Sequence, residues 1–333
     1  MTNIFSIITA EVINTIVAQS PKMVYEAVKN AYIQHGKGLA LNPSSYFLSF
    51  PDQARSRIIA LPGLIMQSPR IAGIKWISSN PDNLKRNLKR ASAVIILNDY
   101  DTGYPIACLE GSIISALRTV YSAILVSEHL LDTKNTKQTL GIVGAGNLSE
   151  QFIKSFINQN WTVDQIALFD LDDQASNRLK ATIHKINPAI KVVLAQNLEG
   201  LVKQSDLIFL STTTSAPYIS ELAWFTHNPI VLNISLRDLE PEILLASNNI
   251  VDDTSHVLNT NTSPHLAYQK SGNNDFINCS AYDLISGYHN FSPNKPTIFS
   301  PMGMGVLDLM LANCIYEKSQ TQNLDIKINN FFE

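Results

Sequence analysis

Two basic residues stand inside apolar stretches of the sequence, where a buried charge needs a partner. Lys75 lies in IAGIKWIS and Arg118 lies in SALRTV. Ammonium and guanidinium groups both donate charge-assisted hydrogen bonds to carboxylates, so this pair suits the binding of an acidic substrate. Other interpretations stay open at this point. The stretch IAGIKWIS alone favours a lysine on the wet face of an antiparallel sheet, and Arg118 fits a structural ion pair equally well.

Asp238 is the acidic residue best placed for proton transfer. It follows the strand-like run VLNISL, and open parallel sheets bind ligands beyond the carboxyl ends of their strands. A carboxylate at that position can exchange protons with a substrate. The alternative is a cap for the helix-like segment PEILLA, since aspartate is a preferred N-cap residue.

A glycine-rich turn in LGIVGAGNLSEQF predicts a dinucleotide site. Gly144 permits a tight strand-to-helix turn, Gly146 lets the backbone approach a pyrophosphate, and the following helix offers its N–H groups. The pattern G-x-G-x-x-G is matched only in part, because Ser149 occupies its third position. The next strand ends in Asp170, 24 residues beyond Gly146, where a carboxylate can accept hydrogen bonds from ribose hydroxyls. No lysine or arginine follows before Arg178, which favours NAD over NADP.

The elements that position these residues fall into two groups. Residues 46–109 contain short β-rich runs separated by turn residues, which predicts an antiparallel sheet with DTG at 101–103 as one hairpin turn. Residues 111–131 carry a broad apolar helical stripe, typical of a buried helix between two domains. Later apolar runs alternate with helix-compatible segments, which predicts βαβ units and a parallel sheet. These runs cover residues 140–143, 166–169, 190–194, 207–210, 230–234 and 249–251.

The composition limits the class of protein. At 333 residues and 45% hydrophobic content, the chain is long enough for two domains with buried cores. A net charge of -3 without a basic stripe argues against a nucleic-acid partner. Cys108, Cys279 and Cys314 lack the spacing of a metal site or a disulfide framework, so we expect no metal and a cytoplasmic setting. The apolar N-terminus carries Glu11 and lacks a basic flank, so neither a signal peptide nor a membrane span is expected.

Five segments, in order and spacing, resemble the ornithine cyclodeaminase and mu-crystallin family over nearly the whole chain. They are GIKW near residue 75, LNDYDTGYPIACLEG with ALRT, VGAGNLSEQF, NISLRD and TSPHLAYQ. Within that family, SYFLSFPD, IIALPG, AGIKWISS, KRASAVIILND and SLRDLEPE look most like the dehydrogenases that oxidise N-(2-amino-2-carboxyethyl)-L-glutamate with NAD. The resemblance implies release of L-2,3-diaminopropionate and 2-oxoglutarate, for siderophores or peptide antibiotics.

The resemblance also implies an α/β architecture of two domains. A Rossmann-type, doubly wound parallel sheet is expected to bind NAD over residues 126–301. An α+β domain with an antiparallel sheet is expected over residues 1–125, completed by a C-terminal helix within 302–333. That domain is expected to bind a small amino-acid substrate and to form a homodimer through its sheet.

The family resemblance implies a role for individual residues of this chain. By the resemblance, Lys75 and Asp238 are catalytic, while Lys75 and Arg118 bind the substrate. Arg90 is added to the substrate-binding set, because it is the one member of KRNLKR beside the strand-like AVIIL and is expected to face inward. The residues expected to contact NAD are Thr119, Gly144, Gly146, Asn147, Leu148, Asp170, Thr212 and Ser235.

Departures from the family pattern bear on the reaction. Ornithine cyclodeaminases resemble this chain but carry a glutamate where residues 59–60 are IA, and a lysine near the position of Glu242, which argues against ornithine cyclisation. The alternatives are ornithine cyclodeaminase, alanine dehydrogenase or ketimine reductase of the same fold, or a mu-crystallin-like protein that only binds a nucleotide and a small ligand. An intact set of Lys75, Arg118 and Asp238 favours an enzyme.

One further departure concerns the substrate. The family pattern has an arginine in the first strand of the substrate domain, near Leu48 and Ser49, and this chain lacks it. Either Arg55 or Arg57 is expected to bind the carboxylate in its place, and the sequence leaves both open.

Overall fold

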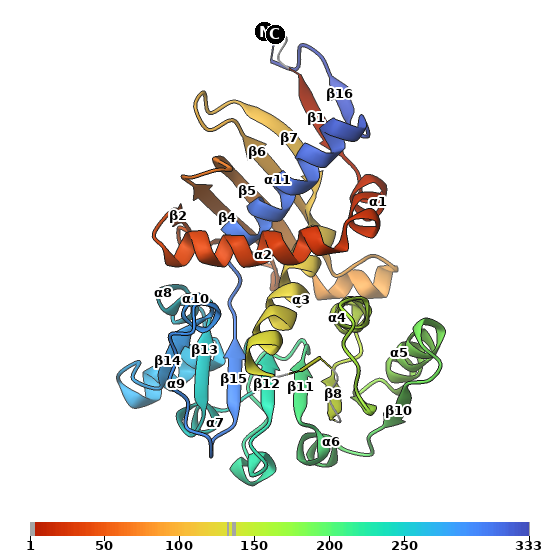
Figure 1. Ribbon diagram of the computed structural model, residues 1–333, viewed down its shortest axis with the longest axis vertical. Helices are drawn as coiled ribbons and strands as arrows, with labels where there is room; N and C mark the ends of the chain where they lie inside the picture. Colours follow the sequence, from red (N-terminus) through yellow and green to blue (C-terminus); the bar gives the residue numbers. More distant parts are fainter. Residues whose placement is uncertain (1–3, 132, 135–137, 333) are drawn as a thin grey trace. The chain divides into compact units, whose positions relative to one another are not determined.

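The chain folds into two compact units, each built around one sheet (Figure 1). The structure, a computed structural model, describes residues 4–131, 133–134 and 138–332. Unit 1 comprises Met1–Thr119 and Gly303–Glu333, and unit 2 comprises Val120–Met302. The boundary expected between residues 125 and 126 falls inside helix α3 (Gly111–Leu130), which begins in unit 1 and ends in unit 2.

The sheet of unit 1 is antiparallel except for one pair of strands. Its strands are β1 (Phe5–Ile8), β2 (Ala40–Leu41), β3 (Tyr46–Phe50), β4 (Gln53–Ile65), β5 (Ile71–Ser79), β6 (Ala91–Asn98), β7 (Pro105–Glu110) and β16 (Ile326–Ile328). Within the described residues their order is β16-β1-β7-β6-β5-β4-β2, with β3 paired to β4, and β1 runs parallel to β7. The predicted antiparallel sheet is confirmed, and the predicted hairpin turn is closed by the Asp99 N–H, which lies 2.8 Å from the Tyr104 carbonyl oxygen.

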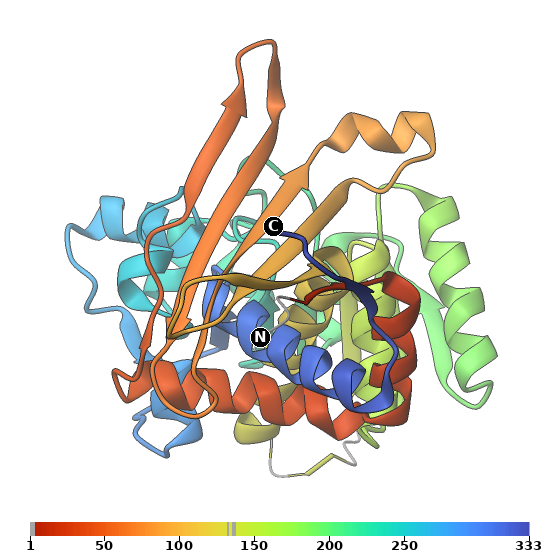
Figure 2. The same ribbon diagram turned by 90° about the horizontal axis from the view of Figure 1, so that it is seen from above.

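Helix α11 (Gly305–Gln322) packs tightly on this sheet. It contacts β4, β5 and β6, and it lies beside α2 (Pro21–Gly36), as Figure 2 shows. Helix α1 (Ala10–Gln19) also contacts α11, and the short helix η1 (Pro81–Arg86) connects β5 to β6. Glycines allow the close approach, because a Cβ atom on Gly63 or Gly73 would lie only 3.0 Å from the Leu309 side chain. Asp308 of α11, whose side chain reaches Lys75 of β5, is therefore fully buried.

The sheet of unit 2 is parallel throughout the described residues. Its strands are β8 (Thr139–Val143), β9 (Gln165–Phe169), β10 (Lys191–Leu194), β11 (Leu207–Leu210), β12 (Ile230–Asn233), β13 (Asn248–Val251), β14 (Ile277–Ser280) and β15 (Thr297–Ser300). The order β10-β9-β8-β11-β12-β15-β13-β14 starts in the middle, builds outward and then crosses to β11, which is the doubly wound arrangement. The predicted parallel sheet is confirmed. Strands β14 and β15 were not predicted from the sequence, because INCS and TIFS are short and half polar.

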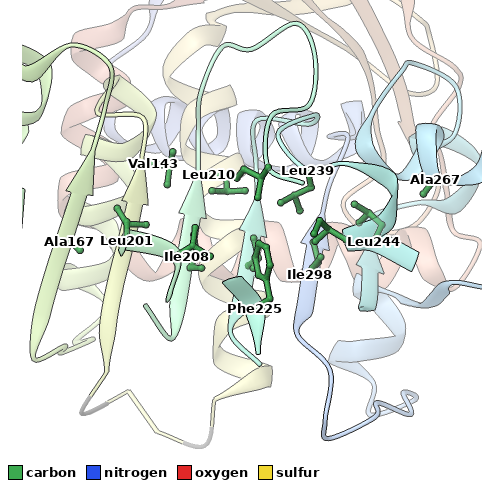
Figure 3. Packing of buried hydrophobic residues seen from close by; sticks show 14 residues of the cluster. Val143, Ala167, Leu201, Ile208, Leu210, Phe225, Leu239, Leu244, Ala267 and Ile298 are labelled. Atoms are coloured by element: carbon green, nitrogen blue, oxygen red, sulfur yellow. The ribbon is translucent and has the colours of Figure 1, made fainter. Parts of the chain in front are cut away.

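Helices pack on both faces of the parallel sheet. The helices of unit 2 that follow α3 are α4 (Asn147–Asn158), α5 (Asp173–Ile186), α6 (Leu198–Gln204), η2 (Leu222–Phe225), α7 (Pro241–Leu245), α8 (Thr254–Val257), α9 (Ser263–Ser271) and α10 (Ala281–Ile285). Leu201 of α6 joins Ile208 and Leu210 of β11 in one apolar cluster (Figure 3). Phe152 of α4 stacks on Phe209 with ring centroids 4.0 Å apart. Neighbouring residues of a strand point to opposite faces, so α4 and α6 cover opposite sides of the sheet.

Candidate active site

The turn between β8 and α4 has the backbone that a dinucleotide site requires. Gly144 adopts a φ of 90°, which only glycine accommodates easily, and a Cβ atom there would lie 2.9 Å from the Ser211 carbonyl oxygen. Gly146 is the N-cap of α4 and carries no side chain to occupy the helix N-terminus. A Cβ atom on Gly146 would meet nothing within 4 Å, so the space beside this backbone is open.

Ser149 fills the third position of the glycine pattern without loosening the turn. Its side chain is buried, and its hydroxyl donates to the Gly144 carbonyl oxygen at 2.6 Å. The Ser149 and Ser211 hydroxyl oxygens are also 2.7 Å apart. Helix α4 is therefore tied to the ends of β8 and β11, the two central strands between which the order of the sheet reverses.

Asp170 lies at the same turn. It follows β9 directly, and its Oδ2 atom lies 2.6 Å from the Ala145 backbone nitrogen, which donates to it. Its other oxygen, Oδ1, accepts from the Asp172 N–H at 2.9 Å. A glycine turn, a helix N-terminus without a side-chain cap and an acid at the next strand end fit the pyrophosphate and ribose of a dinucleotide.

Alanine substitutions at the two glycines should separate folding from cofactor binding. We expect Gly144→Ala to lower the melting temperature, because alanine strains the positive φ and its Cβ meets the Ser211 carbonyl. Gly146→Ala should keep the melting temperature and weaken NAD binding, because its methyl group occupies space left open for the pyrophosphate. Thermal melts beside NAD titrations check both, and equal NAD affinity of Gly146→Ala and wild type would contradict the assignment.

Asp238 lies in a cluster of hydroxyl groups. Its side chain is fully buried. Oδ1 accepts hydrogen bonds from the Thr212 hydroxyl at 2.5 Å and the Tyr218 hydroxyl at 2.7 Å, and Oδ2 accepts from the Ser235 hydroxyl. Three donors suit an ionised carboxylate, which is an acceptor only. The helix-cap interpretation of Asp238 is wrong, because Glu240 is the N-cap residue of α7.

Tyr218 is a site residue that was not predicted from the sequence. Burial, and then the nearby Asp238 carboxylate, raise the pKa of Tyr218 well above its usual range, so the phenol stays protonated and donates to Asp238. The only local signal was the hydroxyl-rich run STTTSAPY. The bend that returns Tyr218 to Asp238 is set by backbone bonds, since the N–H groups of Tyr218 and Ile219 both lie 3.0 Å from the Asp238 carbonyl oxygen.

The loop before Asp238 holds a strained residue. Leu236 has a φ of 78°, a conformation that costs a branched side chain about 1–2 kcal/mol. Its carbonyl oxygen accepts from the Ser263 N–H at 2.7 Å, which anchors the loop to the start of α9. The strained conformation of Leu236 lies between Ser235 and Asp238, in the loop that positions both side chains.

Lys75 lies on the covered face of the unit 1 sheet. It is 1% exposed, so the wet-face interpretation is wrong. Its Nζ atom lies 2.6 Å from Asp308 Oδ2 and 3.1 Å from Ser115 Oγ. The pKa of Lys75 is lowered to about 8, and burial is the largest cause. Arg118 also lowers this pKa, while the Asp308 carboxylate opposes the shift.

Arg118 shares the same acid. Its Nε atom lies 3.2 Å from Asp308 Oδ1, which is the ion pair that the sequence left as an alternative to substrate binding. Gly303 packs so closely that a Cβ atom there would lie 2.5 Å from Arg118 Nη1. Asp308 was missed from the sequence, although an acid inside the apolar run GVLDLMLA is the same kind of signal as Arg118 in SALRTV.

Sequence comparison assigns the family. Residues 8–323 match the ornithine cyclodeaminase/mu-crystallin family. The chain belongs to this family. N-((2S)-2-amino-2-carboxyethyl)-L-glutamate dehydrogenase of Staphylococcus aureus is 29% identical over 312 residues, which cover 91% of this chain and 92% of that relative. The resemblance inferred from the sequence motifs is confirmed.

Solved structures of the family share the fold. Delta(1)-pyrroline-2-carboxylate reductase of Thermococcus litoralis, in complex with NADH and L-proline, has a TM-score of 0.87 at 21% identity, covering 97% of this chain and 100% of that chain. An archaeal alanine dehydrogenase dimer with bound NAD has a TM-score of 0.84 at 21% identity, covering 98% of this chain and 100% of that chain.

Arg55 and Arg57, the two candidates for the missing strand arginine, lie in different surroundings. Arg57 pairs with Ser49 across β3 and β4, and it lies four residues from Leu61, which pairs with Lys75. Strand alternation therefore puts Arg57 on the face of the sheet that carries Lys75. Arg55 is exposed and forms an ion pair with Asp82, at 3.0 Å from Nη2 to Oδ1. Register favours Arg57 at the position of the missing strand arginine.

Arg90 is not brought close to Lys75 in this family member. It is exposed, so the expectation that it faces inward is wrong, and it directly precedes Ala91, which pairs with Ser79. Four residues of strand separate Ser79 from Lys75, a span of about 13 Å, and Arg57 lies at the same distance along the sheet because it pairs with Ser79. Arg90 differs from Arg57 in its exposure. Its place in the substrate-binding set stays a prediction.

The remaining expected contacts occupy defined positions. Thr119 ends the unit 1 part of α3, and its hydroxyl donates to the Ser115 carbonyl oxygen at 2.7 Å. Asn147 and Leu148 form the first turn of α4. In the described part of the chain, no three His, Cys, Asp or Glu side chains gather as a metal site, and no helix is both long and apolar enough to cross a membrane.

Proposed function

We propose that this protein catalyses the NAD-dependent oxidative cleavage of N-(2-amino-2-carboxyethyl)-L-glutamate to L-2,3-diaminopropionate and 2-oxoglutarate, as a precursor step for siderophores or peptide antibiotics. The chain is an NAD-dependent oxidoreductase acting on a CH–NH bond. The observation that supports this choice of substrate is the buried pair Lys75 and Arg118, whose charges suit a ligand with carboxylates. Turnover of this amine, compared with L-alanine, L-ornithine and L-proline at equal concentration, tests the proposal.

Each group of the site has a task in this reaction. The turn with Gly144 and Gly146, together with Asp170, would hold NAD, which would supply the hydride acceptor for the Cα atom of the glutamate part. The resulting imine would be hydrolysed by water. Arg118 and Lys75 bind carboxylates of the substrate and orient that carbon, with Arg57 as a further donor on the same face. Asp238 takes the proton that the amine nitrogen loses and releases it to solvent. It then takes a proton from the attacking water and returns it to the nitrogen as the C–N bond breaks. Thr212, Tyr218 and Ser235 hold its carboxylate oxygens still during both transfers.

The preference for NAD over NADP is expected to depend on Asp170. A carboxylate beside the ribose repels a 2'-phosphate. The double variant Asp170→Ser with Leu171→Arg should narrow the ratio of kcat/KM values between the two cofactors. Leu171 is 96% exposed, whereas Asp172 caps α5 and is better left unchanged. Equal use of both cofactors by the wild type would contradict the preference.

The proposed homodimer forms through the open face of the unit 1 sheet. Trp76 pairs with Ala60 and Val94, and alternation puts these three on the face opposite Lys75. Trp76 and Val94 are each 40% exposed, an apolar patch that suits a second copy of the chain. The alanine dehydrogenase of the same fold is a dimer. Sedimentation as a monomer at micromolar concentration would contradict this assembly.

A cytoplasmic location is part of the proposal. Cys108, Cys279 and Cys314 are free thiols, and burial raises the pKa of each. Free, unreactive thiols suit a reducing compartment.

A further inference from the structure

Asp308 is a buried acid divided between two cations. Its side chain is fully buried, with Oδ2 directed to Lys75 Nζ at 2.6 Å and Oδ1 to Arg118 Nε at 3.2 Å. Buried ion pairs add little stability compared with well-packed apolar side chains. Stability alone therefore does not account for three charged groups inside unit 1.

The surrounding elements fix the atoms of this cluster. Lys75 comes from β5, where the residues paired with it, Leu61 and Ile95, are apolar. Ser115 of α3 accepts from Lys75 Nζ at 3.1 Å, and Arg118 follows one helical turn later. Asp308 comes from α11, which the glycines of β4 and β5 admit to close contact. Asp308 therefore fixes the positions of both the Lys75 ammonium and the Arg118 guanidinium.

Asp308 also governs the charge on Lys75. Burial and Arg118 both lower the pKa of Lys75, and the Asp308 carboxylate is the charged group that raises it. With Asp308 in place the pKa is about 8, so the ammonium form predominates at neutral pH. Without the carboxylate the pKa falls further, and neutral lysine donates no charge-assisted hydrogen bond.

We propose that Asp308 is a positioning residue, which holds the Lys75 ammonium and the Arg118 guanidinium so that both bind a carboxylate of the substrate. The proposal rests on the proposed function only in taking the ligand of Lys75 and Arg118 to be an anionic amino or keto acid.

The test compares full-length wild type with Asp308→Asn in binding 2-oxoglutarate, measured by calorimetry across pH with saturating NADH. Wild-type binding should weaken as pH rises through about 8, where Lys75 loses its proton. In Asp308→Asn the weakening should begin at lower pH, with a Kd about tenfold or more higher at neutral pH. An unchanged pH dependence in Asp308→Asn overturns the proposal, and so does absence of wild-type binding at every pH.

Asp325→Asn is the matched control. This buried acid of the same unit accepts from Ser6 Oγ at 2.7 Å and Gln320 Nε2 at 2.6 Å, so its loss should leave the pH dependence unchanged. If Asp308→Asn does not fold, Asp308→Glu keeps the charge but displaces it. If Asp308→Glu binds 2-oxoglutarate with a higher Kd and the wild-type pH dependence, the proposal is supported. An unchanged Kd overturns it. Because binding is measured without turnover, failure of the proposed substrate in an activity assay is a separate result.

Discussion

Asp238→Asn should lose about a hundred- to ten-thousand-fold in kcat while it still binds NAD, because an amide accepts hydrogen bonds but cannot take a proton. The substitution keeps the shape of the side chain that Thr212, Tyr218 and Ser235 surround. Steady-state kinetics and an NAD titration on the same preparation measure both effects.

The control for Asp238 is another acid of unit 2. Asp206 accepts from the Thr139 N–H at 2.9 Å, at the amino ends of the strands and away from the carboxyl ends that hold Asp238. Asp206→Asn should keep the wild-type kcat. If Asp238→Asn also kept it, Asp238 would be a structural residue and another group would exchange the protons.

Arg118→Lys and Lys75→Met should each lower kcat/KM by about a hundredfold, the loss of one or two charge-assisted bonds. Lysine at position 118 keeps the charge but loses the planar fork that grips a carboxylate through two bonds. Thermal melts run beside the kinetics correct for any unfolded fraction.

Arg55→Lys is the control for the two cations. Arg55 belongs to the same unit, but it is exposed and pairs with Asp82, so its replacement should change neither kinetics nor melting temperature. If Arg118→Lys and Lys75→Met lowered only the melting temperature, the cluster with Asp308 would be a structural ion-pair network.

Local patterns in the sequence predicted most of the fold. The six apolar runs of unit 2 are strands of the parallel sheet, because strands buried on both faces need continuous apolar residues. The same rule explains the failure at β14 and β15, whose segments INCS and TIFS are half polar. The short strands β1 and β16 lie at opposite ends of the chain, so no local pattern in the sequence indicates that they pair. They meet because both chain ends return to one edge of the sheet.

The candidate site could be predicted only where its residues are marked by neighbours in the chain. Alternation puts Lys75 on one face of a strand, but which face is covered depends on α11, 233 residues further along. Asp308 and Tyr218 were missed for the same reason: each acts through a partner that the fold alone brings near. Arg55 and Arg57 are equivalent in the sequence, and the pairing of Arg57 with Ser49 separates them.

The proposed reaction oxidises the glutamate carbon of the substrate. The direct test supplies full-length protein with NAD and N-(2-amino-2-carboxyethyl)-L-glutamate carrying deuterium at the glutamate Cα atom, and follows the label by mass spectrometry. We predict deuterium in the reduced cofactor, unlabelled 2-oxoglutarate and unlabelled L-2,3-diaminopropionate in equal amounts. Release of deuterated L-glutamate, or no reduced cofactor from this amine while L-alanine or L-ornithine yields it, would contradict the account.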